Sequence, residues 1–86
     1  MKNIVKNLIK FIDHAKSFGL LNRDLENAED FLENNEFGLC FDTIVTQLYE
    51  FDVEINEEFC LIADQIGKSL GLEPETYSYI KELIKK

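Results

Sequence analysis

Apolar side chains recur at steps of three and four residues along most of the chain, the spacing of helices that bury one face. The first such segment covers residues 3–18 and stops before Gly19, a residue typical of helix C-termini. A second covers residues 23–35, and a third lies within residues 34–52. Asn56, followed by two glutamates, is typical of an N-cap and opens a fourth segment that ends at Gly71, while Pro74 opens a fifth. The pattern predicts an all-α fold, a compact single-domain bundle of about five short helices.

The apolar positions of these segments define the expected core. They are Ile4, Val5, Leu8, Ile9, Phe11, Ile12, Ala15, Phe18, Leu25, Ala28, Phe31, Leu32, Phe37, Cys40, Phe41, Ile44, Val45, Leu48, Phe51, Phe59, Ile62, Ala63, Ile66, Leu70, Tyr77, Ile80, Leu83 and Ile84. Residues 52–55 break the helical pattern and have no evident partner strand. We interpret them as a loop whose Val53 and Ile55 fill the core.

Gly38 stands near the start of the third segment, where glycine costs about 1 kcal/mol relative to alanine in a helix. Two explanations are open at this point. Without a side chain, the third helix can approach the second helix or a binding partner closely. Alternatively, the helix starts only at Leu39, after a turn.

Length and composition indicate an ordinary globular domain formed by residues 1–86. The chain is 45% apolar and 30% charged, with one proline and four glycines. It contains no apolar run near the roughly 20 residues that span a bilayer, and its N-terminal segment is interrupted by lysines, unlike a signal peptide. We therefore expect a cytoplasmic protein, with Cys40 and Cys60 as reduced core residues.

Charge is unevenly distributed along the chain. Residues 1–23 hold five bases and one acid, residues 24–64 hold thirteen acids and no lysine or arginine, and residues 65–86 are nearly balanced. The net charge of −8 therefore comes from the middle of the chain. Interspersed signs are the usual arrangement on a protein surface, so this segregation requires an explanation.

Two explanations fit the charge pattern. The acids form a solvated face, with the second helix packed against the basic first helix, or they form a docking face for a cationic protein. Direct nucleic-acid binding is disfavoured because phosphate contacts require clustered bases. Lys2, Lys6 and Lys10 form an i, i+4 ridge that could touch an anionic membrane, but such a ridge is more often the solvated side of a helix, and we expect no membrane partner.

Residue patterns typical of enzymes are incomplete. The single histidine, His14, falls on the polar side of the first helix with no nucleophile beside it in sequence. Together with Cys40 and Cys60 it lacks the close-spaced ligand pairs of zinc sites. Residues 52–63 resemble a calcium loop superficially but lack both its turn glycine and its final glutamate. We expect no catalytic activity, no metal and no cofactor.

Four short pieces occur in order within residues 31–72. They are Asn35-Glu36-Phe37-Gly38-Leu39, then Leu48-Tyr49-Glu50 with Asp52, then Ile55 before Asn56, and finally Leu70-Gly71-Leu72. In this order they resemble the MafI-type immunity proteins of bacterial polymorphic toxin systems, which are related in role to the immunity proteins of contact-dependent growth inhibition. The resemblance covers about half of the chain. Cys40 departs from it, because a small residue such as alanine is expected there.

The resemblance implies an all-helical protein that binds and neutralises one cognate toxin C-terminal domain in a 1:1 complex. In such systems the toxin is often an RNase, including EndoU-type nucleases, which must hold polyanionic RNA on a basic surface. The alternative is an acidic helical adaptor or regulatory subunit that binds another basic protein, and a broad nucleic-acid mimic is a third class. We expect the partner-binding residues to be Glu36, Asp42, Gln47, Tyr49, Glu50, Asp52 and Glu54.

Overall fold

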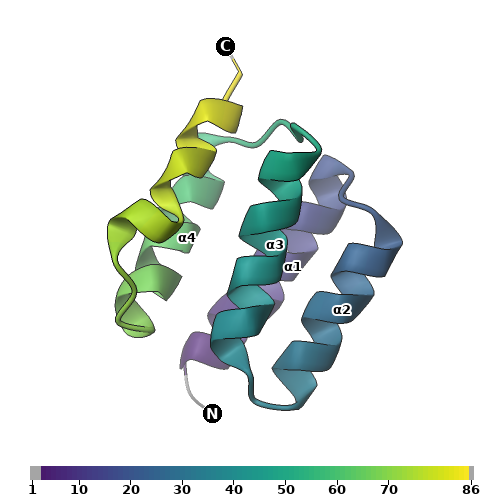
Figure 1. The fold of residues 1–86 in the computed structure, drawn as a ribbon, viewed down its shortest axis with the longest axis vertical. Coiled ribbons are helices and arrows are strands. Elements are labelled where there is room, and N and C mark those ends of the chain that lie inside the picture. Colours follow the sequence, from purple (N-terminus) through teal and green to yellow (C-terminus); the bar gives the residue numbers. More distant parts are fainter. Residues whose placement is uncertain (1–2, 86) are drawn as a thin grey trace.

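The computed structural model describes residues 3–85 and confirms the all-α class. Its elements are α1 (Asn3–Phe18), α2 (Asn22–Glu33), α3 (Phe37–Glu50), α4 (Glu57–Ser69), and two 3-10 helices, η1 (Pro74–Thr76) and η2 (Ser78–Leu83). The four α-helices run in alternating directions, and the segment that holds η1 and η2 runs back along α4 in the opposite direction to it (Figure 1). The α2 and α3 helices lie side by side with α1 behind them, and η2 runs alongside both α4 and α3. The C-terminal segment therefore forms one edge of the bundle.

Three fully buried phenylalanines form the centre of the core. Phe11 of α1 stacks on Phe59 of α4, with ring centroids 4.3 Å apart, and contacts Phe41 of α3 at 5.2 Å. Most of the expected core residues are buried or packed against this cluster. The prediction was wrong for Ile9 and Phe51, which are each 45% exposed. Phe51 follows the last turn of α3, so its ring leaves the buried face and lies 5.6 Å from the Arg23 guanidinium carbon.

All four α-helices end in the same hydrogen-bonded turn, the Schellman motif. In each, the residue after the C-cap has a positive φ: Gly19 (102°), Asn35 (60°), Asp52 (50°) and Gly71 (70°). The amide of the following residue donates to a carbonyl five residues back, as from Val53 to Leu48 at 3.0 Å. At the other end of a helix, the Asn56 side chain accepts from the Phe59 amide at 2.9 Å and caps α4 as predicted. These turns keep the connections short.

The predicted fifth helix is a pair of 3-10 helices. Tyr77, Ile80 and Leu83 are buried and recur at a strict step of three residues, which matches the three residues per turn of a 3-10 helix. The predicted loop lies beside this segment. Ile55 is buried, its amide donates to the Leu83 carbonyl at 3.1 Å, and it forms an isolated parallel bridge with Ile84. The loop thus joins the C-terminal segment to the core.

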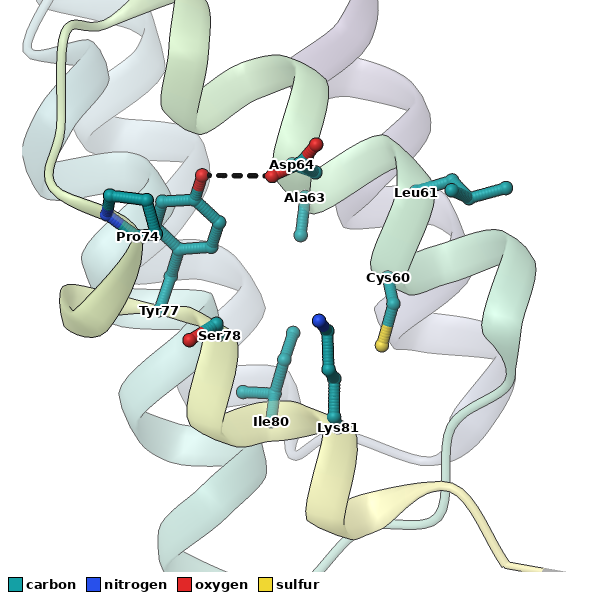
Figure 2. A pocket seen from close by; sticks show the side chains of 9 residues that line it. All are labelled: Cys60, Leu61, Ala63, Asp64, Pro74, Tyr77, Ser78, Ile80 and Lys81. Atoms are coloured by element: carbon teal, nitrogen blue, oxygen red, sulfur yellow. Dashed lines mark hydrogen bonds between the residues drawn. The ribbon is translucent and has the colours of Figure 1, made fainter.

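Tyr77 holds the C-terminal segment on α4. Figure 2 shows its ring lying against α4, with its hydroxyl donating to an Asp64 carboxylate oxygen at 3.1 Å. The ring fits because α4 carries Gly67 at that point, and a Cβ added there would lie only 2.7 Å from the Tyr77 hydroxyl oxygen and closer still to two ring carbons. Gly67 is therefore the glycine that permits close packing within the molecule.

Gly38 has a different environment from the one expected. It lies within α3, which begins at Phe37 and not at Leu39. An added Cβ would meet no atom within 4 Å, so Gly38 does not bring α3 closer to α2. Close approach of α3 to α2 and a helix start at Leu39 were therefore both wrong as explanations of this glycine. The backbone of α3 is exposed at Gly38.

Candidate partner-binding surface

The acidic middle of the chain remains largely without cationic partners. Within residues 3–85, three ion pairs form: Arg23–Asp24 (3.6 Å), Lys68–Asp64 (3.1 Å) and Lys85–Asp52 (3.4 Å). The α2 helix exposes a set of carboxylates that takes part in none of these pairs, namely Glu26, Glu29, Asp30 and Glu33. Packing of α2 against the basic helix α1 therefore does not neutralise the α2 carboxylates by direct pairing.

The outer face of α3 brings together three of the predicted site residues. Asp42, Tyr49 and Glu50 are all exposed, and Asp42 accepts a long hydrogen bond of 3.5 Å from Thr46. Since residues three and four apart share one side of a helix, Thr46 lies between Asp42 and the Tyr49–Glu50 pair. The three predicted residues therefore form one surface, about two turns long.

The other charged residues predicted for the site lie at the ends of α3. Glu36 is exposed at the N-terminal end, whereas Asp52 and Glu54 follow its C-terminal end. The 14 residues of α3 separate the two groups by about 20 Å. Asp52 also contributes to the fold, because its backbone adopts the left-handed conformation of the turn and its side chain pairs with Lys85. These residues can act only at the edges of an interface centred on α3.

Gln47 faces α2 and is half-buried, unlike the surface residue that the sequence suggested. Its amide nitrogen donates to an Asp24 carboxylate oxygen at 3.1 Å. Asp24 is only 3% exposed, and its second oxygen has no hydrogen-bond partner within residues 3–85. A buried carboxylate without a hydrogen-bond donor destabilises the folded state. The Gln47 side chain is therefore held towards Asp24, where it stabilises the fold. Gln47 therefore contributes less to the outer face of α3 than predicted.

Two residues of this surface were missed in the sequence, and both come from η2. The Tyr49 hydroxyl donates to a Glu82 carboxylate oxygen at 3.2 Å, and the rings of Tyr49 and Tyr79 meet edge to face with centroids 4.8 Å apart. The hydrogen bond and the negative charge of Glu82 raise the pKa of Tyr49 above its ordinary value. The three-residue period of the C-terminal segment placed Tyr79 and Glu82 on one row, so a signal was present.

Two separate hollows lie where α3 meets the C-terminal segment, and we refer to the pair as the α3 groove. The tyrosine hollow, of about 410 Å³, is lined by Thr46, Tyr49, Glu50 and Tyr79. The apolar hollow, of about 350 Å³, is lined by Gly38, Leu39, Phe41, Asp42, Val45, Leu72 and Thr76. Leu39 and Tyr49 are 48% and 43% exposed. The α3 groove thus combines exposed apolar and aromatic side chains, which are typical of the anchoring centre of protein interfaces, with carboxylates, which are typical of the polar rim.

A third hollow, of about 280 Å³, lies between α4 and the C-terminal segment (Figure 2). Hydrogen bonds from Lys68 and Tyr77 lower the pKa of its Asp64 carboxyl. Burial raises the pKa of the Cys60 thiol, although the charge of Lys81 acts in the opposite direction. Asp64 is therefore already bound by neighbouring side chains, and the thiol is held in its protonated form.

The remaining candidate residues have ordinary surroundings. Both cysteines are free, and burial raises the pKa of Cys40 to about 11. His14 is half-buried, with its ring 6.2 Å from both the Phe18 and Phe59 rings, and so lies closer to the core than predicted. Lys6 and Lys10 are exposed, while Lys2 lies outside the described residues.

Within the described part of the chain, no three His, Cys, Asp or Glu side chains are placed to hold a metal ion together. Over the same residues, no helix combines the length and hydropathy needed to cross a bilayer. Comparison with known proteins found no matching family model, no matching curated protein and no matching solved structure.

Proposed function

We propose that this protein is a non-catalytic immunity protein that binds a basic toxin C-terminal domain in a 1:1 complex and holds it inactive. The observation that carries the proposal is the α3 groove, in which exposed Leu39 and Tyr49 are surrounded by carboxylates without a cation partner inside residues 3–85. A protein surface of this kind is suited to a partner that is both basic and partly apolar.

The two parts of the surface would act at different stages of binding. The carboxylates of α2 attract a basic partner over distances up to the Debye length, about 8 Å at physiological salt, and raise the association rate. The exposed apolar side chains of the α3 groove become desolvated in the complex and slow its dissociation. Protection at low toxin concentration requires nanomolar or tighter binding, about −12 kcal/mol.

A nuclease is the favoured toxin, with an RNase of the EndoU type suggested by the sequence resemblance. Such an enzyme must hold a polyanion on a basic surface, so carboxylates can occupy the same surface as the substrate. The alternative function, an acidic adaptor or regulatory subunit for another basic protein, uses the same α3 groove. The two functions differ in the partner, and the partner therefore decides between them.

Calorimetric titration against the toxin domain encoded by the gene immediately upstream tests the proposal. We expect nanomolar 1:1 binding that persists at high salt and becomes tighter at low salt. Replacing the four α2 carboxylates by glutamine is expected to reduce the salt dependence, whereas Glu57→Gln and Glu58→Gln, exposed in the first turn of α4, serve as the control. Absence of binding at both salt concentrations would refute the immunity function for that pair and favour the adaptor.

A further inference from the structure

We infer that the α3 groove receives a basic amphipathic helix of the partner, which inserts an apolar side chain into the apolar hollow and an arginine into the tyrosine hollow. The inference rests on the proposed function and specifies the chemistry of the partner at the same surface. It concerns the contact between two proteins and not the reaction of the toxin.

The apolar hollow is open to a side chain from outside. Gly38 borders it without a side chain, and nothing lies within 4 Å of the position that a Cβ would occupy. Leu39 is 48% exposed beside it, and Leu72 is half-buried across the groove. Removing apolar surface from water lowers the free energy. The hydrophobic effect would therefore be enough to hold a leucine or methionine of the partner in this hollow. Contact with a partner therefore explains the glycine at position 38, which packing within the molecule does not explain.

The tyrosine hollow has the groups that recognise a guanidinium. Tyr49 and Tyr79 supply two aromatic rings that meet at 80°, and Glu50 stands on the same wall. Glu50 makes no ion pair with a cation of residues 3–85, and a Glu82 carboxylate oxygen accepts a hydrogen bond from the Tyr49 hydroxyl. Arginine stacks on aromatic faces and pairs with carboxylates through a planar fork, which lysine cannot do. Charge complementarity therefore selects an arginine for this hollow.

The spacing of the two hollows selects a helix as the occupant. The α3 residues that line them are centred about seven positions apart, which corresponds to about 10 Å along the helix axis. Two side chains at positions i and i+7 of a partner helix lie on the same face at the same separation. The C-terminal segment, which supplies the opposite lining residues of both hollows, runs in the same direction as α3 (Figure 1). Asp42, which lines the apolar hollow, adds a further exposed carboxylate to the surface.

A peptide probe tests the inference without the toxin. The probe is an alanine- and glutamine-based helix of about 16 residues with leucine and arginine seven positions apart. We expect it to shift the amide resonances of Gly38, Thr46, Tyr49 and Tyr79 in two-dimensional NMR. Replacing its arginine by citrulline, the neutral isostere, should weaken binding about five- to tenfold, and replacing its leucine by alanine should weaken it similarly. Shifts confined to α2, or no shifts at millimolar peptide, would overturn the inference.

Variants of the full chain test the same contact in the complex. Glu50→Gln and Leu39→Ala should each weaken binding of the upstream-encoded toxin domain by at least about tenfold, while Glu58→Gln, exposed at the start of α4, leaves it unchanged. If the toxin domain binds and both groove variants bind as tightly as the wild type, the inference fails and the proposed function stands. If the toxin domain does not bind but the peptide occupies the groove, the proposed function fails and the chemistry of the groove is supported.

Discussion

Gly67→Ala is expected to destabilise the protein, even though alanine is the better helix former. Gly67 is buried in α4, and the added Cβ would overlap the Tyr77 ring. To restore ordinary contact the ring must withdraw by about 1 Å. This movement strains the packing of Tyr77 against Phe41, whose centroid lies 5.5 Å from that of Tyr77, and breaks the hydrogen bond to Asp64.

The expected change in unfolding free energy combines two costs and one gain. Overpacking of a buried site costs about 1–3 kcal/mol, and loss of the Tyr77–Asp64 hydrogen bond adds about 1 kcal/mol. Helix propensity returns about 1 kcal/mol. The net loss of unfolding free energy is therefore about 1–3 kcal/mol, or a decrease in Tm of about 5–20 °C for a chain of this size.

Gly38→Ala is the matched control, because Gly38 is also helical but has open space around it. It should be neutral or stabilising by up to about 1 kcal/mol. Urea unfolding followed by circular dichroism measures both variants. In a Tyr77→Leu background, which removes the ring, Gly67→Ala should lose at least about 1 kcal/mol of its cost. The explanation is refuted if Gly67→Ala is as stable as the wild type or if the cost is unchanged without the ring.

Three further predictions concern the same structure. Gln47→Ala should lower the unfolding free energy by about 1–3 kcal/mol because Asp24 loses its donor, and urea unfolding should show Thr46→Ala within about 0.5 kcal/mol of wild type. At the left-handed turn after α3, Asp52→Gly should be about 1 kcal/mol more stable than Asp52→Ala in the same assay, since both variants lose the ion pair and only alanine is strained; equal stabilities would contradict this. Burial raises the pKa of Cys40 from 9.0 to about 11, so its protonated thiol contributes to stability below pH 9, and this contribution is lost as the pH rises towards 11. The Cys40 thiol should therefore resist a disulfide reagent at pH 8 until the protein unfolds. Rapid reaction of the native protein would show that the site is open to solvent.

The helical framework was predictable because its signals are local. Gly19, Asn56 and Gly71 mark helix ends through backbone conformation and capping, and the apolar spacing identifies which face is buried. The 3-10 character of the C-terminal segment was also present in the sequence, as the strict three-residue step between Tyr77, Ile80 and Leu83. The predicted burial of Phe51 was wrong because this residue lies beyond the last turn of α3, where helical periodicity no longer determines which way a side chain points.

The roles of individual polar and small residues were less predictable because tertiary neighbours decide them. Gln47 lies seven positions after buried Cys40, on the side of α3 that packs against α2, yet only the position of Asp24 turns this into a structural hydrogen bond. Gly38 and Gly67 are indistinguishable as helical glycines in sequence. They differ because a tyrosine ten residues further along the chain packs on Gly67 and nothing packs on Gly38.

The exposed apolar residues are not equally good candidates for binding a partner. Leu61 is the most exposed of the large apolar side chains in the described structure, at 66%, but single exposed leucines are common on protein surfaces. Leu39 and Tyr49 are less exposed, yet each borders a hollow and lies on a helix face that carries carboxylates. Affinity depends on apolar side chains that a partner can enclose and on charges that it can neutralise, not on exposure alone. The residues around α3 are therefore a better candidate for the proposed interaction surface than Leu61, the most exposed of these side chains.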